Sequence, residues 1–284
     1  SASLERAVAN LRSLVEQGYD PLGLIVDRAH ERGMEVFISY RLNEVHAVEQ
    51  EDSLLFSTFW KQHPEWRIGK AGDPLPELYK QILGPDTHPI VASWLPGGLN
   101  FAVPEVRAQR LAELRECCER YAIDGLDLDF QRFPMYFKPG EEAQHIETMT
   151  AWMREIRTMT RSFSHERGRP IQLTARVMAK PEQNQGIGLD PATWAREGLT
   201  DFLTVSHYLR NDFALPINAY RQAMPPGYPL CASIEVAKDQ DTYRRIAREL
   251  WRDGVDGIML FNFFTVRERG EEPPFGLIRE IMTP

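Results

Sequence analysis

Carboxyl side chains near the ends of two apolar segments are the groups in this sequence best suited to chemistry. Asp127 and Asp129 alternate with leucines in segment 123–130, and Glu235 comes late in segment 230–236. Side chains alternate between the two faces of a strand, so all three carboxyl groups fall on the face opposite the apolar residues. Carboxyl groups brought together in this way can exchange protons with a substrate or stabilise a developing positive charge.

Two further segments place polar side chains on the same face. Segment 34–42 points Arg41 inward, with Asn43 next in that set, and segment 171–178 points Arg176 inward. A buried salt-bridge network, such as Arg41 or Arg176 against Asp127, is the structural alternative. We favour a site at the carboxyl ends of the strands, because the interiors of purely structural barrels are filled mainly by branched apolar residues.

The segment 202–209 has two interpretations. Either Thr204, Ser206 and Tyr208 point inward, or Leu203, Val205 and His207 do. Both His207 and Tyr208 are therefore candidates for contacting a substrate, and Asn262 at the end of the last apolar segment is a similar candidate. The other histidines show no metal-binding spacing, so we expect neither a metal nor a cofactor.

The elements that must position these residues form a repeated strand and helix pattern, which favours a mostly parallel sheet. Six strands are expected, at 34–42, 123–130, 171–178, 202–209, 230–236 and 257–263. We predict one TIM-barrel domain over residues 1–284. A closed (β/α)8 barrel has eight strands, so the first two would lie upstream of Ser1, or a weak strand would be hidden in 44–103.

Residues 44–103 form a long insertion between a strand and the next helix, and such connections often serve function. The insertion holds Trp60, Trp66 and Trp94, whose flat rings could stack on sugar rings or pack a core of the loop itself. Trp94 is retained as a substrate-binding candidate.

Composition excludes several classes of partner. The formal net charge is −8 and no basic run stands out, so nucleic acid is not expected as a partner. No apolar stretch has the length of a membrane span, and the three cysteines indicate neither a disulfide framework nor a metal site. Oligomeric state is not indicated, and secreted, periplasmic and cytoplasmic locations all stay open.

The run YAIDGLDLDFQRFP at 121–134 resembles the bacterial glycosyl-hydrolase-like TIM-barrel proteins, which are related to glycoside hydrolases. Four other stretches agree: YDPL at 19–22 with AHERG at 29–33, HPEW at 63–66, LNFAVPEVR at 99–107 and GVDGIMLFNF at 254–263. The same core is similar to the chitinase signature of glycoside hydrolase family eighteen. That signature ends in a catalytic glutamate, where this chain has Gln131, an amide that cannot act as the acid.

Numbered back from the last strand, Asp129 ends strand four and Glu235 ends strand seven. By resemblance to the largest clan of retaining TIM-barrel glycosidases, Asp129 would be the acid/base and Glu235 the nucleophile. This clan has Asn and Glu where the chain has Leu128 and Asp129, so the pairing is firmer than the roles.

The resemblance implies a glycoside hydrolase that cleaves a poly- or oligosaccharide, with retention of configuration. Arg41, Asp127, Arg132 and Arg176 would orient the carboxylates or hold hydroxyls and acidic substituents of the carbohydrate. Two alternatives stay open: a carbohydrate-binding barrel without catalysis, favoured by Gln131, and a lyase or isomerase on the same fold.

Overall fold

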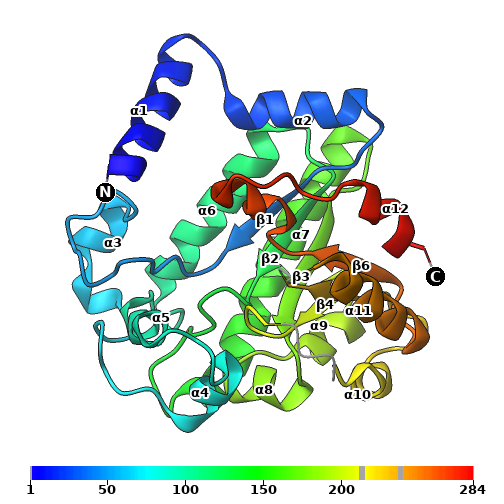
Figure 1. Ribbon diagram of the computed structural model, residues 1–284. Coiled ribbons are helices and arrows are strands. Elements are labelled where there is room, and N and C mark those ends of the chain that lie inside the picture. Colours follow the sequence, from blue (N-terminus) through cyan, green and yellow to red (C-terminus); the bar gives the residue numbers. More distant parts are fainter. Residues whose placement is uncertain (1, 211–214, 236–238, 284) are drawn as a thin grey trace.

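The computed structural model describes residues 2–210, 215–235 and 239–283 (Figure 1). Six parallel strands form one sheet in the order β1-β2-β3-β4-β5-β6. The strands are β1 (Phe37–Arg41), β2 (Gly125–Asp129), β3 (Gln172–Met178), β4 (Phe202–Ser206), β5 (Leu230–Ile234) and β6 (Gly257–Leu260). All six predicted strands are confirmed, with shorter ends. Val236, expected at the end of the fifth, lies outside the described residues.

Helices connect the strands and begin at residues suited to that position. Asp20, Asp190 and Asp239 cap their helices by accepting hydrogen bonds from backbone N–H groups of the first turn. The longer helices are α1 (Ala2–Glu16), α2 (Pro21–Glu31), α6 (Pro104–Arg120), α7 (Ile146–Arg167) and α11 (Gln240–Arg252). The shorter ones are α8 (Pro181–Gly186), α9 (Pro191–Arg196), α10 (Ile217–Ala223) and α12 (Gly276–Ile281), with 3-10 turns η3 (Glu142–His145) and η4 (Phe263–Arg269).

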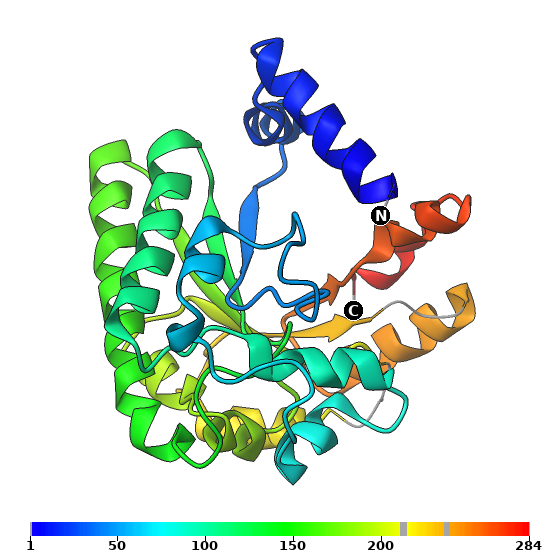
Figure 2. The ribbon, with the colours of Figure 1, turned by 90° about the vertical axis from the view of Figure 1, so that its left-hand side faces the viewer.

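The sheet curls into a partial barrel with helices such as α6 and α7 along its outer face (Figure 2). Leucines of β2 are fully buried between the sheet and these helices, while the alternate side chains face the inside of the curl. Strands β1 and β6 are the two edges of the sheet and do not pair with each other. The described residues therefore form six βα-type units, and a closed eight-stranded barrel is not among them.

Residues 44–103 form the connection between β1 and α6. They contain α3 (Thr58–Gln62), α4 (Glu77–Leu83), α5 (Pro89–Trp94) and the 3-10 turns η1 (Pro64–Trp66) and η2 (Leu95–Gly97). Their one extended pairing is an isolated antiparallel bridge between Arg67 and Leu99. The expectation of a strand hidden in this insertion is wrong, because the few backbone bonds that join residues 66–72 to 93–100 form no more than this single bridge, and the other backbone bonds of the insertion lie mostly within short helices and turns.

Candidate active site

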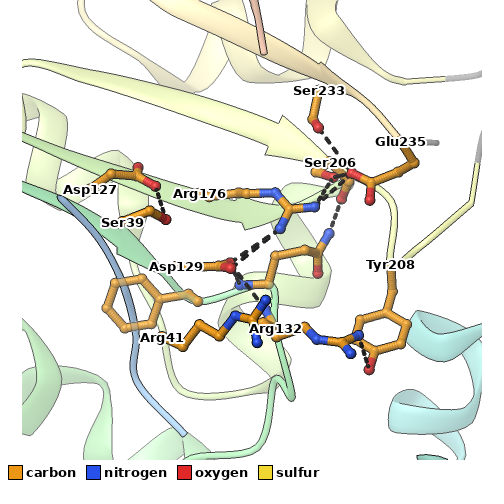
Figure 3. Close-up of polar contacts among 12 residues, drawn as sticks. Ser39, Arg41, Asp127, Asp129, Arg132, Arg176, Ser206, Tyr208, Ser233 and Glu235 are labelled. Atoms are coloured by element: carbon orange, nitrogen blue, oxygen red, sulfur yellow. Dashed lines mark hydrogen bonds and ion pairs between the residues drawn. The ribbon is translucent and has the colours of Figure 1, made fainter. Parts of the chain in front are cut away.

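The register of the sheet brings the polar side chains of neighbouring strands into layers. Asp129 at the end of β2 pairs with Arg41 of β1 on one side and with Arg176 of β3 on the other. Parallel strands end at one edge of the sheet, so Glu235, which directly follows β5, reaches the same edge. The polar side chains that the alternation places on the inner face therefore lie close together in the structure (Figure 3).

Arg176 joins the two carboxylates. Its Nη1 lies 3.4 Å from each oxygen of Asp129, and its Nη2 donates to Oε1 of Glu235 at 2.6 Å. Asp129, Arg176 and Glu235 are each 2% exposed or less. The ring of Phe261 lies under the guanidinium, 3.9 Å from its central carbon. A buried guanidinium with two counterions and an aromatic face is held rigidly in place.

Glu235 uses its two oxygens differently. Oε1 also accepts hydrogen bonds from the hydroxyls of Ser206, at 2.7 Å, and Ser233, at 2.9 Å. Oε2 is buried and has no hydrogen-bond partner among the described residues. Three donors fix one oxygen, and the lone pairs of the other are not used by any described residue.

Asp129 is fixed by the backbone that follows it. Its Oδ1 accepts hydrogen bonds from the backbone N–H groups of Gln131, at 3.0 Å, and Arg132, at 3.1 Å. This tight turn continues into Phe133, whose φ of 53° is unusual for a residue with a side chain. The amide of Gln131 donates to the carbonyl of Ser206, so this side chain ties the ends of β2 and β4 together.

Asp127 lies one layer lower than Asp129. Its carboxyl group accepts hydrogen bonds from Ser39, at 2.9 Å, and Thr174, at 2.9 Å. Burial, together with the neighbouring charge of Asp129, raises the pKa of Asp127. The same layer lines a cavity of about 360 Å³ inside the curl of the sheet. Asp127 therefore belongs to the interior beneath the two bridged carboxylates, which do not line that cavity.

A second polar cluster lies beside the carboxylates and includes residues that the sequence analysis did not select. Arg132 donates to the hydroxyl of Tyr208 at 3.2 Å and to Nε2 of His46 at 2.8 Å. Nδ1 of His46 faces the carboxylate of Glu44, which also accepts from Arg41 at 3.0 Å. We call Arg41, Glu44, His46, Arg132 and Tyr208 the rim cluster.

Two pKa shifts follow from this arrangement. Burial alone would raise the pKa of Glu44, but hydrogen bonds from His46 and Arg41 bring it down to about 2. Burial also raises the pKa of Tyr208 to about 12, so the phenol stays protonated at neutral pH. Glu44 and His46 follow β1 in the chain. Their proximity to the predicted Arg41 is the one sequence signal that could have selected them.

The tryptophans of the insertion divide into two groups. Trp94 lies beside the rim cluster, with its ring 5.5 Å from that of His46. Trp60 is buried, stacks on Phe56 and donates to the carbonyl of Gly97. Trp66 stacks on His63. The aromatic core of the insertion thus accounts for Trp60 and Trp66, while Trp94 reaches the candidate site.

Three expected ligands have other surroundings. Asn43 is not free to bind a substrate, because its buried amide donates to the carbonyls of Leu99 and Met135 and accepts from the N–H of Leu99. In β4 the inward set is the one with Ser206 and Tyr208, while His207 is buried beside Arg210. Asn262 follows β6 with a φ of 52° and caps the next turn through its carbonyl.

Backbone strain gathers at this end of the sheet. The non-glycine residues with positive φ in the described chain are Ala47, Phe133, Leu209 and Asn262, and each lies in the connection after a strand. A left-handed conformation costs such a residue roughly 1–2 kcal/mol, and strain of this kind concentrates at functional sites. This points to the same edge of the sheet as the carboxylates.

The described residues contain neither a metal-binding cluster nor a membrane-spanning helix. Across residues 2–210, 215–235 and 239–283, no group of three or more His, Cys, Asp or Glu side chains is placed to hold a metal ion. Within the same ranges no helix combines the length and apolarity needed to cross a membrane.

Three solved structures to which the chain is similar overlap it only in part. An α-amylase from Geobacillus thermoleovorans, complexed with acarbose, has a TM-score of 0.49 and 15% identity, over 84% of this chain and 52% of the amylase. The glycoside hydrolase domain of PelA from Pseudomonas aeruginosa has a TM-score of 0.43 and 12% identity, over 83% of this chain and 82% of that domain. A family 18 N-acetylglucosaminidase from Paenibacillus barengoltzii has a TM-score of 0.42 and 13% identity, over 57% of this chain and 72% of the enzyme.

These overlaps are low, so the activity of the chain must be argued from its own residues. No curated protein matches the chain. The family model described as glycosyl hydrolase-like 10 matches residues 6–157, which include the run from Tyr121 to Pro134. The match covers more than half of the sequence and confirms the resemblance drawn from the motifs: the protein belongs to the glycosyl hydrolase-like 10 family.

Proposed function

We propose that the protein is a glycoside hydrolase on a (β/α)8-type scaffold and that Asp129 and Glu235 are its catalytic pair. The observation that carries the proposal is the bridge through Arg176, which holds two buried carboxylates from β2 and β5 at the carboxyl edge of one sheet. Cleavage of an acetal needs one group to protonate the leaving oxygen and another to stabilise or capture the oxocarbenium-like carbon. Two carboxyl groups held apart by one guanidinium are suited to these two separate roles.

The contacts of each carboxyl group support different roles. In Glu235, Oε1 is fixed by three donors and Oε2 has no partner within the described ranges, so we assign Oε2 as the atom that attacks the anomeric carbon. In Asp129, Oδ1 is fixed by two backbone N–H groups, while the contact of Oδ2 is the 3.4 Å approach of Arg176. We therefore assign Glu235 as the nucleophile and Asp129, through Oδ2, as the acid/base.

The bridge limits the separation of the pair. Contacts of 3.4 Å and 2.6 Å to one rigid guanidinium place the nearest oxygens of Asp129 and Glu235 no more than about 8 Å apart. Retaining enzymes have carboxyl groups about 5–5.5 Å apart and inverting enzymes about 6.5–9.5 Å, so this limit admits both. We propose retention, because numbering back from β6 gives the pair the strand positions of the retaining clan.

The test is hydrolysis of a panel of neutral and acidic polysaccharides, measured as release of reducing sugar. Asp129→Asn and Glu235→Gln keep the shapes of the side chains, so each should reduce turnover by about a thousandfold while the protein stays folded. Asp253→Asn, at the exposed end of α11, is the matched control and should leave turnover unchanged. Turnover close to that of the wild type in either site variant removes that residue from the mechanism.

Stereochemistry is tested on whichever substrate is cleaved. Proton NMR of the first product formed distinguishes the two anomers before they interconvert. Retention requires the product to have the configuration of the substrate, and the opposite anomer would show that water attacks directly.

A carbohydrate-binding barrel without catalysis is the second candidate. It is favoured by the depth of the pair, since Asp129 is 1% and Glu235 2% exposed, and by Gln131 at the position of the chitinase acid. Binding of a polysaccharide without any product over a long incubation would decide for this candidate.

A further inference from the structure

The rim cluster contains a partly buried cation whose partners are all neutral groups. Arg132 contacts the hydroxyl of Tyr208 and Nε2 of His46, and among the described residues no carboxylate lies within salt-bridge distance of its guanidinium. Four other arginines with little exposed side chain have such a partner: Arg67, Arg110, Arg157 and Arg176. A charge withdrawn from water without a counterion is costly and needs an explanation.

Several hydrogen-bond donors at this place are unused. A guanidinium has five N–H groups, and Arg132 uses two of them on side chains; among the described residues its Nε is buried without a partner, as are the Nε atoms of the four arginines named above. The indole Nε1 of Trp94, beside His46, is a different kind of donor and is also buried without a partner in the part of the chain that the structure describes. Buried polar atoms are nearly always paired in proteins, so unpaired donors together indicate an acceptor-rich ligand.

Arg41 adds a second positive charge. Burial lowers the pKa of Arg132, the charge of Arg41 lowers it further, and the charges of Glu44 and Asp129 act in the opposite direction. Figure 3 shows both side chains at the same edge of the sheet as Asp129. Glu44 is the one carboxylate within the rim cluster, and it is already shared between Arg41 and His46. Within the rim cluster itself two guanidinium groups therefore share one carboxylate, and the nearest carboxylate outside the cluster is that of Asp129, which Arg132 contacts through its backbone N–H and not through its guanidinium.

We propose that Arg132 and Arg41 bind an acidic substituent on a sugar of the substrate, a carboxylate or a sulfate ester. This inference rests on the proposed carbohydrate substrate and specifies its class. An anion would supply the missing counterion, and its two or three oxygens match the planar fork of a guanidinium, whereas a neutral hydroxyl would leave the charge uncompensated. The rim cluster lies beside Asp129, so the acidic sugar would occupy a subsite next to the bond that is cleaved.

Binding is measured separately from cleavage, by affinity gel electrophoresis at low salt with two matched pairs of polymers. Polygalacturonate is compared with its methyl ester, and dextran sulfate with dextran. We expect the wild type to bind at least one acidic member about tenfold more tightly than its neutral partner. The two pairs distinguish a carboxylate ligand from a sulfate ligand.

Three variants test which arginines are responsible for binding of the acidic polymer. Arg132→Met should reduce binding of the acidic polymer about tenfold, and Arg41→Met, at a more exposed position, should reduce it severalfold without affecting folding. Arg248→Met removes the same charge from the exposed surface of α11 and should leave binding unchanged. A circular dichroism spectrum matching the wild type is required of each variant.

Three results would overturn the proposed acidic subsite. These are equal or tighter binding of the neutral polymers, no binding of any polymer, or a loss of binding in Arg248→Met as large as in the two site variants. The proposed hydrolase is judged on product formation instead. An acidic polymer that is bound and never cleaved overturns the hydrolase and leaves the subsite, whereas cleavage confined to neutral polymers does the reverse.

Discussion

Replacing Arg176 with methionine should destabilise the protein through charge rather than through packing. Methionine fills most of the volume of the arginine stem and can still contact the ring of Phe261. The variant loses the guanidinium contacts to Asp129, at 3.4 Å, and to Glu235, at 2.6 Å. Both carboxylates then stay buried without a cation.

The expected loss follows from these contacts. Removing one partner of a buried ion pair costs about 3–5 kcal/mol, because the remaining charge is uncompensated. Backbone N–H groups still stabilise Asp129, and the hydroxyls of Ser206 and Ser233 still stabilise Glu235. We therefore expect a loss near the lower end of this range. This is still a large part of the 5–15 kcal/mol that typically separates folded from unfolded states.

Urea unfolding at neutral pH, followed by tryptophan fluorescence and circular dichroism, measures the loss, and coincidence of the two signals checks for a two-state transition. The decisive comparison is a triple variant that combines Arg176→Met with Asp129→Asn and Glu235→Gln. It removes all three charges, and most of the lost stability should return, since neutral replacements of buried ion pairs are often well tolerated. Arg154→Met, which breaks the exposed ion pairs of Arg154 with Glu147 and Glu197, is the control.

A triple variant as unstable as Arg176→Met alone would contradict an electrostatic role for Arg176. That result would mean that the shape of the arginine, and not its charge, stabilises the site. A single variant as stable as the wild type would also refute it, because the two carboxylates would then not depend on Arg176.

Three other substitutions have defined outcomes in urea unfolding. Burial and the charge of Asp129 raise the pKa of Asp127, so the wild type loses stability as pH rises through that pKa. Asp127→Asn should remove this loss, so at higher pH its free energy of unfolding should exceed that of the wild type by about 1.4 kcal/mol for each pH unit by which the pKa is raised. Free energies of unfolding that depend on pH in the same way in both proteins would contradict this. Asn43→Ala leaves three buried backbone groups unpaired and should cost about 1–3 kcal/mol, so an unchanged midpoint would show that they find other partners. Gly125→Ala puts a methyl group 2.2 Å from the ring of Phe37 and should cost about 1–3 kcal/mol, with recovery when Phe37→Leu is added.

The alternation of apolar and polar residues determined where the strands lie and which of their side chains face the interior. Leu126 and Leu128 must be buried, so Asp127 and Asp129 must point into the curl, and the structure places them there. The same reasoning places Arg176 inward. Within a strand, period and burial are local properties, which is why the sequence is sufficient. The segment with His207 and Tyr208 was ambiguous because both of its faces are rich in residues that tolerate burial.

Contacts between distant segments were decided only by the tertiary structure. Asn43 looked like a ligand from its position after β1, yet its amide is spent on Leu99 and Met135, 56 and 92 residues further along the chain. His46 belongs to the site because the turn after β2 places Arg132 within hydrogen-bond distance of its ring. Hydrogen bonds of this kind depend on how a long insertion folds back, and no local period encodes that. The sequence by itself determined which side chains face the interior, and the packing of residues 44–103 determined which of them are free to meet a ligand.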